Sequence, residues 1–294
     1  MTHLATTDRS VLATVEDDVL RLIDLALEED RGPGDWTSRW IVPARTRTLA
    51  RIVARAEGMV AGLTPALAVF MRLDGRIETN RLVDDGSRVR SGDVLLELSG
   101  PARAILTGER VALNFLQRLS GVATLTSRFV AAVAGTGTHI LDTRKTTPGW
   151  RSLEKDAVRA GGGTNHRRGL FDAILIKDNH IAIAGGIIDA VRRVRDHNSR
   201  GLHVTVEVAT LDDVDTALGL RVDRLLCDNM DLETLREAVR RVRRHDPAPE
   251  IEASGNMTLD RVRAVAETGV DFISAGALTH SAAALDVSLE ITRP

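Results

Sequence analysis

The stretch DAILIKD, residues 172–178, places a short apolar run directly after one acidic residue and ends it on a lysine and an aspartate. A run of this length with polar ends is typical of a strand buried on both faces. Five more runs of this kind follow the same pattern: THILDT (138–143), HVTVEV (203–208), VDRLLCD (222–228), PEIEAS (249–254) and VDFISAG (270–276). Helical patterns separate these runs, and strands that alternate with helices pair in parallel. The sequence therefore predicts a closed or nearly closed α/β barrel.

The sequence lacks the motifs that are typical of other nucleotide-binding folds. No G-x-G-x-x-G motif opens a helix after the first predicted strand, and no P-loop motif is present. A dinucleotide-binding sheet is therefore not expected.

Composition limits the function further. The 294 residues are 43% hydrophobic, enough for one large domain or two modest ones. A net charge of -2 argues against a general nucleic-acid partner. The single cysteine, Cys227, cannot form an intramolecular disulfide and fits a reducing compartment. The N-terminus resembles no signal peptide and no apolar stretch is as long as a membrane span, so we expect a soluble cytoplasmic protein.

The first part of the chain has a different pattern of hydrophobic residues. Apolar residues recur at helical spacing between Leu12 and Ala26, and a Gly/Pro-rich loop follows. Strand-like patterns then continue to about residue 100, interrupted by one predicted helix at TPALAVFMRL (64–73). Residues 101–133 read as a long helix with a break at Gly121. The domain boundary is predicted within this helix or just after it.

Polar residues or glycine occur at or near the end of every predicted barrel strand. In chain order they are Asp142, Arg144 and Lys145; Lys177 and Asp178; Glu207; Asp228; Glu252, Ser254 and Gly255; and Gly276. In a barrel of parallel strands these ends meet at one face, where functional groups gather. The pattern therefore predicts a single shared pocket.

The predicted pocket holds both signs of charge. Arg144, Lys145 and Lys177 can bind carboxylate or phosphate groups. Glu207 and Asp228 can bind a hard cation such as Mg²⁺ or face a developing positive charge. The glycines near the last strands suit a phosphate cradle. These residues predict an anionic substrate together with a sugar phosphate.

Each of these residues also has a purely structural explanation. A lone Lys177 could pair with Asp178, and Glu207 or Asp228 could simply neutralise nearby cations. The basic segment LREAVRRVRRHD (235–246) reads as the solvated face of a helix, and Cys227 as core packing. The order of the longer motifs, rather than any one residue, favours a functional pocket.

The segment from Leu141 to His180, LDTRKTTPGWRSLEKDAVRAGGGTNHRRGLFDAILIKDNH, closely resembles the quinolinate phosphoribosyltransferase family of NAD biosynthesis. The resemblance extends from GDWTS (34–38) through GERVALNFLQRLSG (108–121) to ETGVDFISAGALTHS (267–281). It implies an N-terminal α/β sandwich at 1–117 and an open, incomplete α/β barrel at 118–280. The C-terminal tail, 281–294, is expected to pack back on the sandwich. The family also implies a homodimer with shared active sites, or a larger oligomer.

The implied reaction transfers phosphoribosyl from phosphoribosyl pyrophosphate to quinolinate with Mg²⁺, giving nicotinate mononucleotide, pyrophosphate and CO₂. By this resemblance the substrate-binding residues are Arg110, donated across the dimer, and Thr143, Arg144, Lys145, His166, Arg167 and Lys177. The phosphate-binding residues are Ser254, Gly255, Asn256, Ala275, Gly276 and Ala277. The implied catalytic residues are Lys145, Glu207 and Asp228, of which Glu207 and Asp228 are also metal ligands.

One departure from the family leaves alternatives open. The family usually has acidic residues on both sides of the glutamate in the third barrel strand, whereas TVEVAT has Thr205 and Ala209 around Glu207. A related phosphoribosyltransferase of the molybdenum-transport-linked type, using another aromatic acid, is therefore an alternative. A Schiff-base lyase with Lys177 as nucleophile and a non-catalytic sensor of phosphorylated metabolites are two more.

Overall fold

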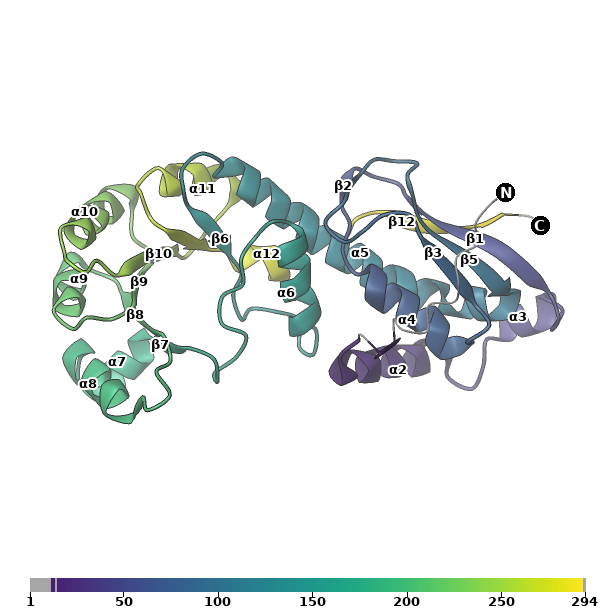
Figure 1. Ribbon diagram of the computed structural model, residues 1–294, viewed down its shortest axis with the longest axis horizontal. Helices are drawn as coiled ribbons and strands as arrows, with labels where there is room; N and C mark the ends of the chain where they lie inside the picture. The colour runs from purple at the N-terminus through teal and green to yellow at the C-terminus, as the bar shows by residue number, and fades with distance from the viewer. Residues whose placement is uncertain (1–11, 14, 293–294) are drawn as a thin grey trace. The chain divides into compact units, whose positions relative to one another are not determined.

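The computed structural model describes residues 12–13 and 15–292 (Figure 1). Its internal contacts divide the chain into two compact units. Among the described residues, the first unit comprises 12–13, 15–125, 147–162 and 282–292, and the second comprises 126–146 and 163–281. Within the described ranges no helix is both long enough and apolar enough to cross a membrane.

The first unit contains a four-stranded antiparallel sheet and several helices. Its helices are α2 (Asp17–Arg31), α3 (Trp36–Ile41), α4 (Leu63–Leu73), the first part of α5 (Ala102–Ala132) and α6 (Arg151–Ala160). Its strands are β1 (Arg47–Ala54), β2 (Gly58–Met59), β3 (Glu78–Arg81), β4 (Arg88–Val89), β5 (Val94–Pro101) and β12 (Val287–Thr292). The helix expected from Leu12 onward begins in the structure as α2, and part of the expected segment lies outside the described residues.

The sheet order β12-β1-β5-β3 places β12, the last strand in sequence, beside β1, the first. Strand β12 pairs antiparallel with β1, from Ala54 opposite Val287 to Leu49 opposite Thr292 (Figure 1). The alternating burial of β1 places Ala50 and Ile52 in the core, as expected for a sheet with one covered face.

Helix α5 runs without interruption through Gly121, so the predicted break is wrong. Gly121 does not kink the helix, but close packing requires a glycine at this position. A Cβ at this position would lie 2.1 Å from the carbonyl oxygen of Ala283, which no side chain could tolerate. Gly121 therefore lets the backbone of residues 283–284 approach the helix closely.

The second unit is a parallel α/β structure. Its strands are β6 (His139–Leu141), β7 (Ile174–Ile176), β8 (Val204–Val208), β9 (Arg224–Asp228), β10 (Glu250–Ser254) and β11 (Phe272–Ser274). Its helices, after the last residues of α5, are α7 (Asp178–Ala184), α8 (Ile187–His197), α9 (Leu211–Leu218), α10 (Leu232–Arg243), α11 (Leu259–Ala266) and α12 (Ala277–His280). Every pairing in its sheet is parallel.

The strand order β6-β11-β10-β9-β8-β7 wraps the sheet into an open barrel. Among the described residues no strand ladder joins β6 to β7, the two edges; Thr164 instead makes an isolated bridge to Leu141. Figure 1 shows α8 to α11 on the outer side of the curved sheet. The predicted fold class, an α/β sandwich domain plus an open α/β barrel, is confirmed.

The barrel helices follow directly from their sequence patterns. In α10 the buried residues Leu235, Ala238, Val239 and Val242 recur at helical spacing, so the arginines of this basic segment lie on the other faces. Asp231 caps the helix, because its carboxylate accepts a hydrogen bond from the Thr234 backbone N–H at 2.8 Å. The predicted amphipathic surface helix is therefore present.

Candidate active site

The carboxyl ends of the six parallel strands gather most of the predicted site residues within the second unit. Parallel pairing keeps these ends at one edge, as in Glu207 opposite Leu226 and Ser254 opposite Asp228. Arg110 is the exception, because it lies on α5 in the first unit, where it is exposed.

Two arginines of the site lie near each other. Arg144 follows β6, and Arg167 lies in the segment before β7, where its guanidinium donates to the Ala173 carbonyl at 3.2 Å. Partial burial, and then the positive charge of Arg144, lower the pKa of Arg167 below its ordinary value. The charge of Asp172 acts in the opposite direction. Guanidinium groups stay charged in proteins, so two of them near each other favour the binding of an anion.

Lys177 and Glu207 form an ion pair across neighbouring strands. The Lys177 ammonium lies 3.3 Å from Glu207 Oε2, and the Asp178 backbone N–H donates to Glu207 Oε1 at 3.5 Å. The Glu207 side chain is 11% exposed and the Lys177 side chain 48% exposed, so the lysine is the more accessible partner. Lys177 therefore pairs with Glu207 rather than with Asp178, the partner considered from sequence.

Asp228 is oriented by a residue that the sequence analysis did not select. Asn229 donates its amide N–H to Asp228 Oδ2 at 2.8 Å, and its backbone is left-handed, with φ of 54°. The Asn229 side chain also lies against Gly255, where a Cβ would meet its Oδ1 at 2.1 Å. Left-handed non-glycine residues are uncommon, and they cluster at functional sites. The predicted phosphate-binding residue Asn256 is also left-handed, with φ of 45°, and this backbone conformation could not be predicted from the sequence.

Lys145 lies beside the loop after the last strand. Its aliphatic stem would be 2.9 Å from a Cβ at Gly276, and its carbonyl accepts the Thr279 hydroxyl at 2.8 Å. The imidazole of His280 would be 3.2 Å from the same Cβ. The Ala275 N–H is already donated to the Leu141 carbonyl, so this N–H does not point to a phosphate.

Three further predicted residues help to fix the loops at this edge. The Thr143 hydroxyl accepts the Lys145 backbone N–H at 3.0 Å. Asp142 is fully buried and accepts the His166 backbone N–H at 2.8 Å and the Asn165 amide at 2.6 Å. These bonds connect the segment after β6 to the segment that carries Arg167.

Glu252 was expected among the strand-end groups, but it lies inside β10 and is fully buried. Its Oε2 is 3.3 Å from His166 Nε2 and 3.1 Å from Arg224 Nη1. Burial alone would raise the pKa of Glu252, but its interactions with His166 first, and then with Ser274 and Arg224, outweigh burial and hold this pKa below its ordinary value. The carboxylate is therefore ionised inside the barrel.

The carboxylates present suit a metal that is only partly bound by protein. Across the described part of the chain, no cluster of three or more His, Cys, Asp or Glu side chains has the geometry of a metal site. Glu207 and Asp228 offer hard oxygen donors, and Mg²⁺ in phosphate sites is commonly held by one or two carboxylates plus the substrate phosphates. The donor set fits Mg²⁺ of that kind.

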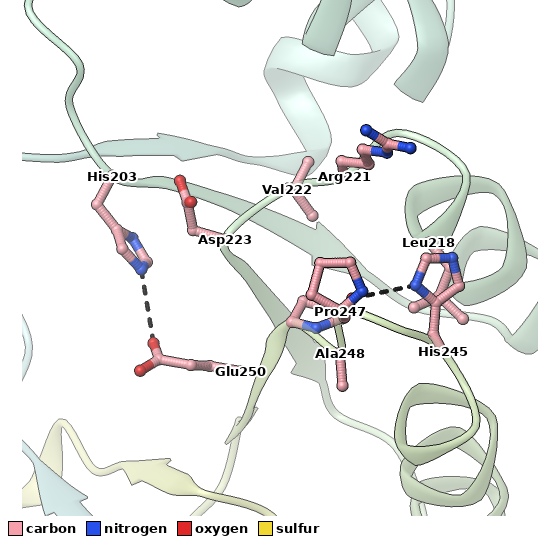
Figure 2. Close-up of a pocket in the computed structure, with 10 residues that line it drawn as sticks. His203, Leu218, Arg221, Val222, Asp223, His245, Pro247, Ala248 and Glu250 are labelled. Atoms are coloured by element: carbon pink, nitrogen blue, oxygen red, sulfur yellow. Dashed lines mark hydrogen bonds and ion pairs between the residues drawn. The ribbon is translucent and has the colours of Figure 1, made fainter.

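The hollow in Figure 2 is a different place in the second unit. Its lining residues, among them His203, Asp223 and Glu250, precede or begin β8, β9 and β10 and therefore lie at the amino ends of the strands (Figure 2). None of the predicted site residues lines it. In barrels this end generally serves stability rather than chemistry.

Known proteins identify the family. The family model described as "Quinolinate phosphoribosyl transferase, C-terminal domain" matches residues 122–290, and the corresponding N-terminal model matches residues 35–120. A "Probable nicotinate-nucleotide pyrophosphorylase [carboxylating]" from Synechocystis is 44% identical, covering 91% of this chain and 90% of that protein. The Mycobacterium leprae nicotinate-nucleotide pyrophosphorylase [carboxylating] is 42% identical, covering 96% of this chain and all of that protein.

Solved structures agree with the sequence matches. The nicotinate-nucleotide pyrophosphorylase of Francisella tularensis superposes with a TM-score of 0.88 at 41% identity, covering 95% of this chain and 98% of that chain. Together the two family models span most of the sequence, from residue 35 to residue 290. The chain therefore belongs to the quinolinate phosphoribosyltransferase family of enzymes.

Proposed function

We propose that this protein transfers phosphoribosyl from phosphoribosyl pyrophosphate to quinolinate in NAD biosynthesis, with loss of CO₂. The observation that carries the proposal is the pair of neighbouring guanidiniums, Arg144 and Arg167, at the carboxyl edge of the barrel. Quinolinate bears two adjacent carboxylates. A dianion of this shape relieves the repulsion between the two arginines, and each guanidinium can bind a carboxylate through two hydrogen bonds.

The neighbouring groups suit the second substrate. Lys145 and the Gly276 loop lie together, and residues 254–256 form a second loop at the same edge, so both are proposed to bind phosphate groups. Lys177 is proposed to contact the substrate beside the arginines, His166 to support Arg167 through its ring Nδ1, and Thr143 to hold the turn before Lys145. The rival substrate of the molybdenum-transport-linked type is not favoured, because the relatives with high coverage bear nicotinate-nucleotide pyrophosphorylase names.

The chemistry follows from charge placement. The pyridine nitrogen of quinolinate forms a bond to C1 of the ribose, and the C1–O bond to pyrophosphate breaks. Glu207 and Asp228 stabilise the positive charge that develops on the ribose. The resulting pyridinium accepts the electron pair released when the 2-carboxylate leaves as CO₂, and that carbon then takes a proton. Positioning and fixed charge supply the catalysis, and no protein nucleophile is needed.

Mg²⁺ is proposed to arrive with phosphoribosyl pyrophosphate. Glu207 and Asp228 would hold it together with substrate oxygens, in keeping with the small number of carboxylates available. Bound there, the ion would neutralise charge on the departing pyrophosphate.

A homodimer is proposed from the surface of the first unit. Trp40 and Ile41 on α3 are 77% and 75% exposed, an unusual amount of apolar surface for so short a helix. Helix α3 is attached to α5, because Thr107 donates to its capping residue Asp35 at 2.9 Å. Arg110 lies one turn after Thr107, so a partner that covers α3 would also meet Arg110. We further propose that the enzyme works in the cytoplasm, where its single cysteine stays reduced.

The decisive assay supplies quinolinate, phosphoribosyl pyrophosphate and Mg²⁺ and measures nicotinate mononucleotide and CO₂. Arg144→Ala should lower kcat/KM by about a hundredfold or more, since it removes a charged hydrogen-bond pair. Arg236→Ala on α10 is the matched control, an exposed arginine away from the strand ends, and should behave as wild type. Turnover with nicotinate in place of quinolinate, or full activity in Arg144→Ala, would refute the proposal.

Shared active sites can be tested by mixing two inactive variants. Arg110→Ala and Arg144→Ala should each be inactive, but their mixed dimer contains one intact site. After subunit exchange, about a quarter of wild-type activity should return, because half of the dimers are mixed and each has one working site. No recovery in a mixture shown to exchange subunits would exclude a shared site.

A further inference from the structure

A chain of charged groups runs through the interior of the barrel. Arg224 begins β9, and its guanidinium donates to Glu250 Oε2 at 2.7 Å and to Glu252 Oε2 at 3.1 Å. It also stacks on Phe272, 4.1 Å from the ring centre. Glu252 then contacts His166 Nε2 at 3.3 Å. The chain therefore connects the amino end of the strands to the segment that carries Arg167.

The ring of His166 is held at both nitrogens. Its Nδ1 accepts the backbone N–H of Arg167 at 2.8 Å, so Nδ1 carries no proton. Nε2 then carries the proton and donates it to Glu252. The side chain of His166 is only 11% exposed, and Asp142 holds its backbone N–H at 2.8 Å. One tautomer and one ring orientation satisfy all of these contacts.

We propose that Glu252 is a positioning residue that acts through His166 on Arg167. The carboxylate fixes the imidazole with its proton on Nε2, and the other ring nitrogen then fixes the peptide N–H from which the Arg167 side chain extends. The inference rests on the proposed function, because it assigns Arg167 to the dianionic substrate. Glu252 itself does not need to touch a reactant.

A carboxylate in the interior of a barrel has a high desolvation cost. Layers of branched apolar side chains are usual there, and apolar replacement of buried ion pairs is often neutral or stabilising. Glu252 is fully buried, and its Oε1 has no hydrogen-bond partner in the described structure. Packing alone therefore does not account for the residue, whereas orientation of His166 does.

The first test uses the unaltered protein and needs no activity. Protein with ¹⁵N-labelled histidine is examined by two-bond ¹H–¹⁵N correlation, and His166→Gln identifies the signal. We expect a neutral ring with the proton on Nε2 at pH 7.5. A proton on Nδ1, or a doubly protonated ring, would overturn the proposal whether or not the proposed reaction is correct.

The second test separates the two substrates. Glu252→Ala should raise KM for quinolinate by roughly tenfold, the value of about one oriented hydrogen bond, and leave KM for phosphoribosyl pyrophosphate within about twofold. Glu252→Gln keeps an acceptor oxygen for His166 and should stay within about threefold of wild type. Partial unfolding of the variant would instead lower the fraction of active enzyme and would not raise KM for one substrate alone.

Glu250→Gln is the matched control. Glu250 binds the same Arg224 but lies at the amino end, where it contacts His203 at 3.5 Å and not His166 (Figure 2). It should leave both KM values unchanged. If Glu250→Gln raises KM for quinolinate as much as Glu252→Ala, or if neither Glu252 variant changes it, Glu252 is not a positioning residue. Absence of turnover in wild type would instead refute the proposed function and leave the tautomer result standing.

Discussion

Gly255 offers a sharp test of how the strand-end loops are built. Its backbone φ is +95°, and a Cβ placed on it would lie 2.1 Å from Asn229 Oδ1 and 2.5 Å from Asn229 Cγ. Asn229 cannot simply swing away at no cost, because its amide donates to Asp228 and its backbone N–H to the Ser254 carbonyl. Gly255→Ala therefore disturbs both the backbone and the side chain that orients Asp228.

The expected destabilisation has two parts. Forcing alanine into left-handed backbone costs about 1–2 kcal/mol. Moving Asn229 out of a contact far below van der Waals distance adds about 1–3 kcal/mol, as for other overpacked sites. Together they should lower the free energy of unfolding by about 3 kcal/mol. Loss of the Asn229 hydrogen bond should also lower kcat/KM for phosphoribosyl pyrophosphate by roughly fivefold to tenfold.

Two variants separate the parts in urea unfolding curves. Gly185→Ala, in the same unit, has φ of +94° and only an ordinary 3.8 Å contact, so it should show the backbone cost alone. Asn229→Gly in the Gly255→Ala background removes the obstructing side chain, and glycine accepts the left-handed φ of 54°. This double variant should recover about 1–3 kcal/mol. Equal stability of Gly255→Ala and Gly185→Ala would refute the reasoning.

Two further predictions concern groups outside the site. Burial favours the neutral form of Asp35, but its bonds to Ser38 and Thr107 dominate and lower its pKa below 3.8. The stabilisation from the Asp35 carboxylate should be complete above pH 3.8 and should vanish as the pH falls through the folded-state pKa. In urea unfolding curves, Asp35→Ala should therefore lower the free energy of unfolding by about 1 kcal/mol at pH 7, and this difference from wild type should disappear in acid. Burial, aided by Glu252, raises the pKa of Cys227 to about 12, so iodoacetamide at pH 8 should label the thiol only after unfolding; rapid labelling of native protein would contradict this burial.

The strand ends could be predicted because they obey a local rule. A short apolar run followed by a polar residue marks where a buried strand leaves the core, and parallel topology brings such ends together. This rule correctly anticipated that the groups at the carboxyl ends of β6, β7, β8 and β9 share one edge. The pairing of Lys177 with Glu207 could not be deduced, because it depends on which strands are neighbours.

Contacts between distant segments explain the features that were missed. Gly121 was interpreted as a break in α5, but its partner is the backbone of Ala283 near the other end of the chain. Glu252 resembled another strand-end group, yet its role depends on Arg224 and His166, which belong to other segments. Asn229 has no distinctive local pattern, and its meaning emerges only from its left-handed backbone and its contact with Gly255.

The two departures from the family pattern, Thr205 and Ala209, differ in how they bear on the proposed metal site. Thr205 is 2% exposed and lies opposite Arg224 in the register of β8 and β9, one layer below the strand ends. Arg224 already has Glu250 and Glu252 as partners, so an acid at residue 205 would add an unbalanced negative charge to a buried layer. Ala209 instead follows the strand and is exposed near Glu207. A carboxylate at residue 209 would lie near Glu207 and could join the proposed Mg²⁺ ligands. If this protein has an altered metal or substrate preference, we therefore expect the alanine at residue 209 to cause it, and not the threonine at residue 205.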